Sequence, residues 1–90
     1  MALEIVLHSQ FKRDYKRIKK QGLDVTKLQA VIETLAQQAS LDQRYKDHPL
    51  RGNRKGYREC HIEPDWLLIY RIVGNELQLA ETGSHADLFD

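Results

Sequence analysis

The sequence has a single cysteine, two prolines and no long apolar run. The lone Cys60 excludes an intramolecular disulfide, which is typical of proteins in the reducing cytoplasm. No apolar segment approaches the roughly 18 residues of a membrane span. The N-terminus also lacks the apolar segment of a signal peptide. We therefore expect one domain over residues 1–90, located in the cytoplasm.

Charge is distributed unevenly along the chain, although the formal net charge is only +1. Residues 1–60 carry 13 Lys and Arg against 7 Asp and Glu, and residues 61–90 carry 1 against 6. Partners must therefore be inferred from local patches of charge and not from the net charge.

Apolar periodicity predicts one strand and two helices in the first half. Residues 2–8 alternate as a half-buried strand does. Ser9 is placed to cap a helix that Gly22 ends, and Asp24 is placed to cap a second helix through about Ala39. The apolar faces are Leu3, Ile5 and Leu7 in the strand, Phe11, Tyr15 and Ile18 in the first helix, and Leu28, Val31, Ile32, Leu35 and Ala39 in the second.

The second half is expected to be mostly strands. Residues 40–54 show neither period and carry Pro49 and Gly52, which indicates an irregular segment. Three strands follow, at about 56–62, 66–73 and 76–82. Ser84 and Asp87 have the spacing of a capping box, which predicts a short helical turn. The predicted fold class is α+β, in the order β-α-α-β-β-β with a C-terminal turn, and a helical hairpin covers one face of the sheet.

Hairpin geometry brings several polar residues together. A two-residue turn at 74–75 would pair Val73 with Glu76 and, further along, Leu67 with Thr82. In that register Asp65 and His85 meet at one edge of the sheet, and His61 joins them across the preceding turn. His48 cannot be placed in this way.

One chemistry that such a group of residues permits is the cleavage of RNA without a metal, which requires a base, an acid and a positive charge near the phosphate. Histidine suits the first two roles because its ordinary pKa is about 6.5. Taken singly, each histidine is more simply explained as a loop, strand or surface residue than as a catalytic one. Trp66 is likewise more simply explained by core packing, and Phe89 by covering the sheet near the C-terminus. A zinc site from His48, His61, His85 and Asp65 is chemically feasible, but no close ligand spacing supports it, so we expect no metal and no cofactor.

Three segments resemble the YafQ branch of the RelE/ParE superfamily of bacterial toxins. They are Tyr45-Lys46-Asp47-His48-Pro49-Leu50-Arg51-Gly52, Gly56-Tyr57-Arg58-Glu59-Cys60-His61-Ile62-Glu63-Pro64-Asp65-Trp66 and Thr82-Gly83-Ser84-His85-Ala86-Asp87-Leu88-Phe89. The resemblance implies a RelE-like fold and a ribosome-dependent mRNA endonuclease that cuts in the ribosomal A site. It implies catalytic roles for four residues: His85 as the general acid, His48 and Asp65 as candidates for the base, and His61 supporting or sharing the work of the base. It also implies nucleotide contacts for Trp66 and Phe89.

One position departs from that family pattern. Family members commonly carry an arginine where this chain has Glu81, and an anion there would repel the scissile phosphate. We therefore expect either reduced activity or a substitute cation, which could be Arg51, Arg54, Lys55, Arg58 or Arg71. In the unbroken hairpin register Arg71 would face away from Glu81, which makes it the poorest substitute.

The resemblance also implies partners. These are the ribosome, mRNA and a cognate antitoxin, expected to be a DinJ-like ribbon-helix-helix protein that alone contacts operator DNA. The cations Lys12, Arg13, Lys16 and Arg17 on the first helix are either a solvated face or a ribosome contact. The alternative is an attenuated or non-catalytic ParE-like toxin that acts through protein partners, since fold alone does not decide activity.

Overall fold

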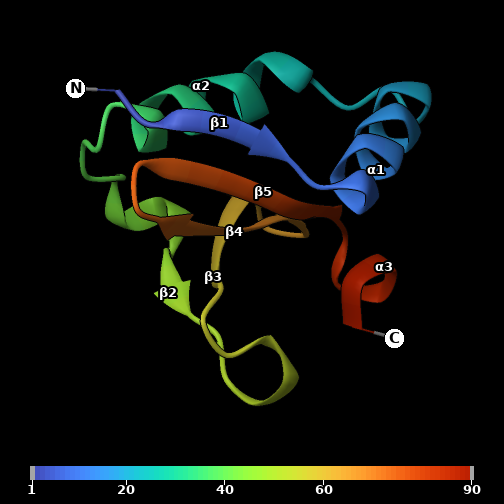
Figure 1. Ribbon diagram of the computed structural model, residues 1–90. Helices are drawn as coiled ribbons and strands as arrows, with labels where there is room; N and C mark the ends of the chain where they lie inside the picture. Colours follow the sequence, from blue (N-terminus) through green and yellow to red (C-terminus); the bar gives the residue numbers. More distant parts are fainter. Residues whose placement is uncertain (1, 90) are drawn as a thin grey trace.

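The computed structural model describes residues 2–89 and contains a five-stranded sheet with two helices packed on one face (Figure 1). The strand order is β1-β5-β4-β3-β2, with β1 parallel to β5 and the other pairs antiparallel. The elements are β1 (Glu4–Leu7), α1 (Ser9–Lys20), α2 (Val25–Ala36), the 3-10 turn η1 (Gln43–Tyr45), β2 (His48–Pro49), the 3-10 turn η2 (Gly52–Arg54), β3 (Arg58–Glu63), β4 (Trp66–Val73), β5 (Glu76–Gly83) and α3 (His85–Phe89).

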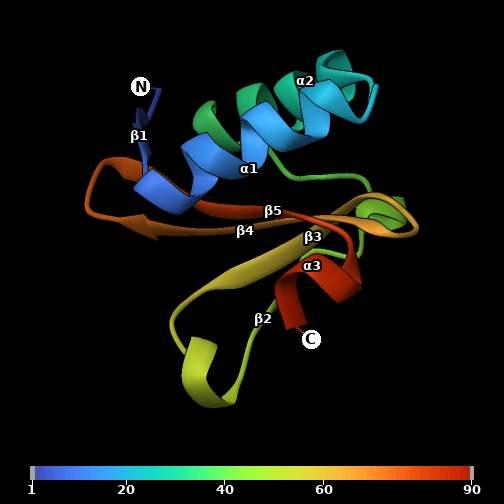
Figure 2. The same cartoon turned by 90° about the vertical axis from the view of Figure 1, so that its right-hand side faces the viewer.

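The two faces of the sheet differ in what covers them. Figure 2 shows α1 and α2 together on one face, whereas α3 and the β2–β3 connection lie on the other. We call the second one the far face. The α+β class and the helical hairpin are as predicted, and β4 is central in the sheet as its apolar sequence indicated. Within residues 2–89, no helix is both long and apolar enough to cross a membrane.

Local capping explains most of the helix boundaries. Gly22, at φ +80°, ends α1 in a left-handed conformation, and the N–H of Leu23 donates to the carbonyl of Ile18 at 3.2 Å. The Asp24 side chain caps α2 by accepting from the N–H of Thr26. Ser9 was wrongly predicted as the cap of α1: Ser9 is already helical, and the cap position belongs to His8, whose side chain makes no capping bond.

Helix α2 is shorter than predicted. It ends at Ala36 and not at Ala39, because the chain turns left-handed at Gln38, where φ is 58°. The N–H of Ala39 then donates to the carbonyl of Thr34 at 3.1 Å. Leu28, Val31 and Leu35 are buried as expected, whereas Ala39 lies exposed beyond the helix.

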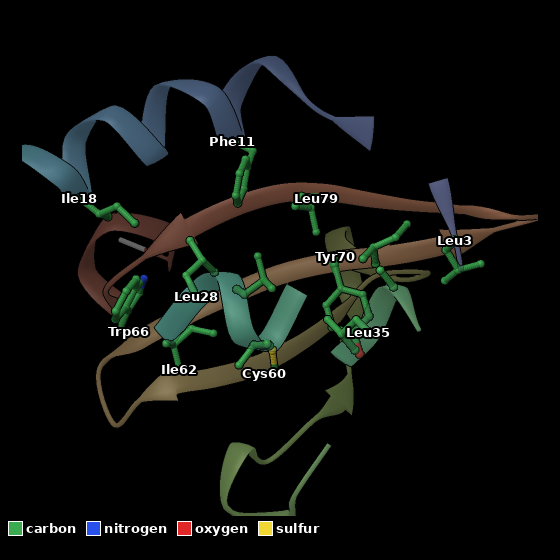
Figure 3. Close-up of a cluster of buried hydrophobic side chains, with 14 residues drawn as sticks. Leu3, Phe11, Ile18, Leu28, Leu35, Cys60, Ile62, Trp66, Tyr70 and Leu79 are labelled. Carbon is green, nitrogen blue, oxygen red and sulfur yellow. The ribbon is translucent and has the colours of Figure 1, made fainter. Parts of the chain in front are cut away.

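The main core lies between the helical hairpin and the sheet. Figure 3 shows Phe11 and Ile18 from α1, Leu28 and Leu35 from α2 and Trp66 and Tyr70 from β4 in this cluster, with the other labelled members being Leu3, Cys60, Ile62 and Leu79. Burial raises the pKa of the Cys60 thiol to about 12, so it is protonated at neutral pH. The expectation of a packed, unreactive cysteine agrees with this environment.

Strand β1 is less buried than its alternation predicted. Leu3 is buried, but Ile5 and Leu7 remain 44% and 42% exposed. The physical reason is position: among the strands of residues 2–89, β1 is the outermost and pairs with β5 alone.

A β-bulge changes the register of the β4–β5 hairpin. Val73 pairs with Glu76 and Tyr70 with Leu79 as predicted, but Ile69 then pairs with Glu81, so Ala80 is the extra residue. Leu67 therefore pairs with Gly83, and the predicted pairing with Thr82 is wrong.

The shift also corrects the placement of Arg71. Glu81 pairs with Ile69, and Ile69 and Arg71 share a face because they are two residues apart on β4. Glu81 and Arg71 therefore lie on the same face of the sheet and not on opposite faces. Arg71 is nevertheless engaged elsewhere: its guanidinium carbon lies 4.8 Å from the ring centre of Tyr57, and its Nε donates to Gln78 at 2.6 Å.

Candidate active site

Three histidines form a row on the far face, although they come from three different elements. The ring centroids of His48 and His61 are 6.3 Å apart, and those of His61 and His85 are 5.8 Å apart. Phe89 continues the row at 6.3 Å from His85. The predicted meeting of Asp65, His61 and His85 is confirmed, since Asp65 contacts His85 directly. It survives the register shift because the bulge moves the pairing by only one residue.

Asp65 orients His85. Its Oδ1 accepts from the backbone N–H of His85 at 3.0 Å and from the imidazole Nδ1 at 2.7 Å. These bonds hold the pKa of Asp65 below its ordinary value, and the bond from the backbone N–H has the larger effect. With Nδ1–H directed at a carboxylate, Nε2 of His85 is the nitrogen left to exchange a proton with a substrate.

Helix α3 carries His85 and is fixed at its start by a reciprocal cap. The N–H of Asp87 donates to the Ser84 hydroxyl, and the N–H of Ser84 donates to the Asp87 carboxylate, both at 3.1 Å. The capping box is as predicted. The backbone N–H of Ser84 first, and then the Ser84 hydroxyl, lower the pKa of Asp87 by hydrogen-bonding to its carboxylate.

His48, which the sequence could not place, enters the row through the short strand β2. His48 pairs with Glu59 of β3, and its Nδ1 donates to the carbonyl of Lys46 at 2.6 Å. The neighbouring Asp47 holds this loop on the sheet by accepting from the Tyr70 hydroxyl at 2.7 Å and from Arg58 Nε at 3.2 Å.

Glu59 belongs to the site and was missed from the sequence. Its side chain is only 7% exposed, and its Oε1 lies 3.3 Å from Nε2 of His61 and 3.6 Å from Nε2 of His48. A buried carboxylate requires such partners, because desolvation penalises an isolated charge. The available signal was spacing: Glu59 and His61 are two residues apart on one strand and must share a face.

Glu81 does not stand alone on this face. It is paired with Arg54 of η2, whose Nη1 donates to the carboxylate. The Nη2 of Arg54 donates to the carbonyl of Leu88 at 2.7 Å, and its guanidinium carbon lies 5.0 Å from the ring centre of Phe89. A cation is therefore held beside the aromatic end of the histidine row.

The remaining predicted substrate contacts separate into different environments. Trp66 is 3% exposed, and its Nε1 donates to the Thr82 hydroxyl at 3.0 Å. The predicted stacking of its ring on a nucleotide does not fit this burial, because the ring packs in the core, although Trp66 also lines a hollow of about 390 Å³. Arg58 is ion-paired with Asp47. Arg51 and Lys55 are exposed.

The four predicted ribosome-binding residues lie on α1, which is on the opposite side of the sheet from α3, the helix that carries His85 (Figure 2). Lys12, Arg13 and Lys16 are exposed. Arg17 differs, because its guanidinium donates to Asp14 Oδ1 and to the carbonyl of Thr82, both at 2.8 Å. It joins α1 to the end of β5.

The site also contains a possible set of metal ligands. Donor atoms of Glu59, His61 and His85 all lie within 4.8 Å of one another. This set differs from the one suggested by the sequence, since Glu59 takes part and Asp65 and His48 do not. One carboxylate and two imidazoles suit zinc or copper.

Comparison with known proteins decides the family. The family model described as "Bacterial toxin of type II toxin-antitoxin system, YafQ" matches residues 3–90. The chain belongs to the YafQ family. The predictions of a YafQ-type toxin and of its fold are thereby confirmed.

Relatives of this family are similar over nearly their whole length. The mRNA interferase toxin YafQ of Escherichia coli K12 is 41% identical over 87 residues, which cover 96% of this chain and 95% of the relative. The crystal structure of YafQ from Escherichia coli BL21(DE3) has a TM-score of 0.93 at 39% identity and covers 98% of this chain and 99% of that one.

Two further YafQ-like structures contain a partner or a metal. The toxin chain matched in the Escherichia coli DinJ-YafQ toxin-antitoxin complex has a TM-score of 0.91 at 40% identity, and all of both chains is covered. A copper-bound mutant toxin from Helicobacter pylori has a TM-score of 0.93 at 40% identity and covers 97% of this chain and 99% of that one.

Proposed function

We propose that this chain is an mRNA interferase that cuts mRNA in the ribosomal A site by acid and base catalysis without a metal. The observation that supports this most strongly is the row of His48, His61 and His85 with Glu59 and Asp65 beside it. Family membership and the name of the Escherichia coli relative support the same reaction.

The proposed general acid is His85. Asp65 accepts from Nδ1, so a protonated His85 presents Nε2–H to the leaving 5′-oxygen. Phe89, at 45% exposure and next to His85, stacks on a base, which stabilises binding by about 1–3 kcal/mol in comparable sites. Of the two aromatic residues predicted to contact a nucleotide, Phe89 is the exposed one and Trp66 is buried.

The proposed base lies at the other end of the row. His48 or His61 takes the proton from the ribose 2′-hydroxyl, and Glu59 between them stabilises the imidazolium that forms. The 2′-oxygen then attacks phosphorus as the bond to the 5′-oxygen breaks. The products are a 2′,3′-cyclic phosphate and a 5′-hydroxyl.

The positive charge for the phosphate comes from Arg54. Among residues 2–89, two of its N–H groups bond to Glu81 and to the Leu88 carbonyl, which leaves three of the five guanidinium N–H groups for an anion. Glu81 thus positions the cation, although its charge also weakens the local field. Activity below that of arginine-bearing relatives remains our prediction.

The proposed partners are an antitoxin of the DinJ type and the ribosome. The antitoxin follows from the DinJ-YafQ complex of the 40% identical relative, and operator DNA would be contacted only through it. Lys12, Arg13 and Lys16 would bind ribosomal RNA through phosphates. Arg17 is left out of this surface because its guanidinium is already bound within the fold.

The test compares cleavage of a translated mRNA on purified ribosomes with the same mRNA free in solution, in excess chelator. We expect cutting only on the ribosome, and a loss of about 100-fold in His85→Gln, since one proton transfer supplies typically 10²–10⁴-fold. His8→Gln is the matched control, because His8 contacts Gln78 and not the row. No cutting by the unmodified chain would favour a binding-only toxin.

We also propose that a transition metal can bind Glu59, His61 and His85 and inhibit cleavage. The convergent donor atoms and the copper-bound Helicobacter pylori relative support this second property. A metal on the imidazoles would block proton transfer. We expect copper(II) titration to shift the ring signals of His61 and His85 and to slow cleavage. Unmoved ring signals would remove the metal site, and loss of activity in chelator would make the metal essential instead.

A further inference from the structure

A pocket of about 680 Å³ adjoins the histidine row. It lies between α2, η1 and the β3–β4 turn, and His61 forms part of its wall. That volume is within the usual 300–1,000 Å³ of sites for small ligands. The pocket is therefore large enough for a nucleotide and shares one side chain with the proposed nuclease site.

The lining favours an anion with an apolar part. Three cations, Lys27, Arg44 and Lys46, line it with a single carboxylate, Glu63, which is ion-paired with Lys27 at 3.3 Å. The other walls are Thr26, Ala30, Tyr45, Ile62 and Pro64.

The aromatic and cationic groups of the lining lie next to each other. The guanidinium carbon of Arg44 is 4.9 Å from the ring centre of Tyr45. Phosphate binding by cations and base stacking on aromatic and guanidinium groups are the usual means of holding single-stranded RNA.

The pocket is continuous with the site because β2 is so short. Strand β2 pairs with β3 only at Glu59 and Arg58, so the outer edge of β3 beyond Glu59 has no strand beside it among the described residues. The pocket follows this open edge from His61 to Glu63. Lys46, on its rim, also supplies the carbonyl that holds His48.

We propose that this pocket holds the mRNA nucleotide adjacent to the one whose bond is cut. The inference rests on the proposed nuclease function and adds a second nucleotide subsite to it. Arg44 and Lys46 contact the phosphate, and Tyr45 with Pro64 contacts the base. The subsite contributes to affinity and to preference at that mRNA position.

The test is amide NMR of the isotope-labelled protein titrated with a 2′-O-methyl trinucleotide, which cannot be cleaved. We expect shifts at Thr26, Ala30 and Glu63 in the pocket together with shifts at His85 and Phe89. Arg44→Gln should weaken binding about threefold to fivefold, as expected for one exposed ionic contact. Lys20→Gln, which removes the same charge from an exposed site on α1, should leave the dissociation constant unchanged.

Three results would overturn the subsite. They are no shift at all, shifts confined to the histidine row, and binding of a free mononucleotide in the pocket with no trinucleotide shift at His85. Ribosomal cleavage is measured separately. Trinucleotide binding in the pocket without cleavage of translated mRNA would contradict the proposed nuclease function and support the nucleotide subsite. Cleavage of translated mRNA with unchanged pocket amide signals would support the nuclease function and contradict the subsite.

Discussion

At the scale of single residues, the pairing of Glu81 with Arg54 sets the charge of the far face. Each side chain is about one quarter exposed, at 24% and 28%, so solvent only partly screens the pair. A carboxylate that would repel the phosphate if unpaired is instead the partner of the nearby guanidinium. Substituting Arg54 and Glu81 one at a time and together therefore separates the role of the cation from that of the carboxylate.

We predict that Arg54→Gln lowers ribosomal cleavage about 100-fold, because it removes the cation at the phosphate and frees Glu81. The exchange Arg54→Glu with Glu81→Arg should recover most of the rate, since a cation stays on the same face. Glu81→Arg alone should exceed the unmodified rate. Single-turnover cleavage on purified ribosomes measures all three.

Two outcomes would contradict these assignments. Unmodified cleavage by Arg54→Gln would show that another cation serves the phosphate. An unchanged rate in Glu81→Arg would mean that Glu81 does not attenuate the enzyme.

At the scale of elements, the five-residue helix α3 depends on its contacts, because a helix this short is unstable by itself. Its start is fixed by Asp65 and by the Ser84–Asp87 cap. Its end is fixed by the buried Leu88, whose carbonyl accepts from Arg54. His85 is therefore placed by three separate parts of the chain.

We predict that α3 loosens in acid before the sheet does. The folded protein holds the pKa of Asp65 and of Asp87 below the ordinary value of about 3.9. A carboxylate with a lowered pKa stabilises the folded state fully when the pH is above its ordinary, unfolded pKa. That stabilisation is lost as the pH falls through the folded pKa, because the carboxylate becomes protonated. Amide NMR from pH 6 to pH 2 should show the His85 signal moving first, and Asp65→Asn should remove part of that change. Simultaneous loss of α3 and β4 would contradict this order.

The junction of α1 with β5 depends on a buried carboxylate. Asp14 is 1% exposed and accepts from Gln10 and Arg17 at 2.8 Å and from the N–H of Thr82 at 3.1 Å. Arg17 approaches so closely that a Cβ added at Gly83 would lie 2.5 Å from its Nη2. This junction holds the end of β5, from which α3 departs.

We predict that Asp14→Ala lowers the free energy of unfolding by about 3 kcal/mol, because it removes the buried acceptor of the Thr82 N–H and of one Arg17 bond. Urea unfolding followed by circular dichroism measures the effect. Lys16→Ala, on the exposed side of the same helix, should change stability by less than about 0.5 kcal/mol. Equal stability of both variants would show that the junction is not structurally important.

At the scale of the whole molecule, the two faces divide the work. Helix α1 with its exposed cations lies on one side of the sheet, and α3, which carries His85 of the histidine row, lies on the other (Figure 2). A surface that binds the ribosome can therefore be altered without touching the chemistry. The small net charge of +1 conceals this separation.

We predict that Lys12→Ala, Arg13→Ala and Lys16→Ala each reduce the slope of log affinity for ribosomes against log salt by about one. Cleavage of mRNA by the ribosome-bound variants should stay near the unmodified rate. Binding measured by sedimentation between about 50 and 200 mM salt tests this directly. Unchanged slopes would mean that these cations are solvated surface only.

The sequence by itself determined the order of the elements, because helix and strand periods, caps and turns are local properties. The capping residue Asp24, the left-handed Gly22 and the turn at 74–75 were all identifiable from neighbouring residues. The meeting of Asp65 with His85 also followed, since a hairpin carries local register across two strands. The resemblance supplied the family, which the comparisons confirm.

Only the tertiary structure decided what depends on contacts between distant segments. The bulge at Ala80, the exposure of β1 and the burial of Trp66 and Glu59 all follow from packing between elements. His48 is placed by Asp47 reaching Tyr70, and Arg54 meets Glu81 across 27 residues of sequence. No periodicity encodes such contacts, because a flexible segment can close in many ways until the packed sheet selects one.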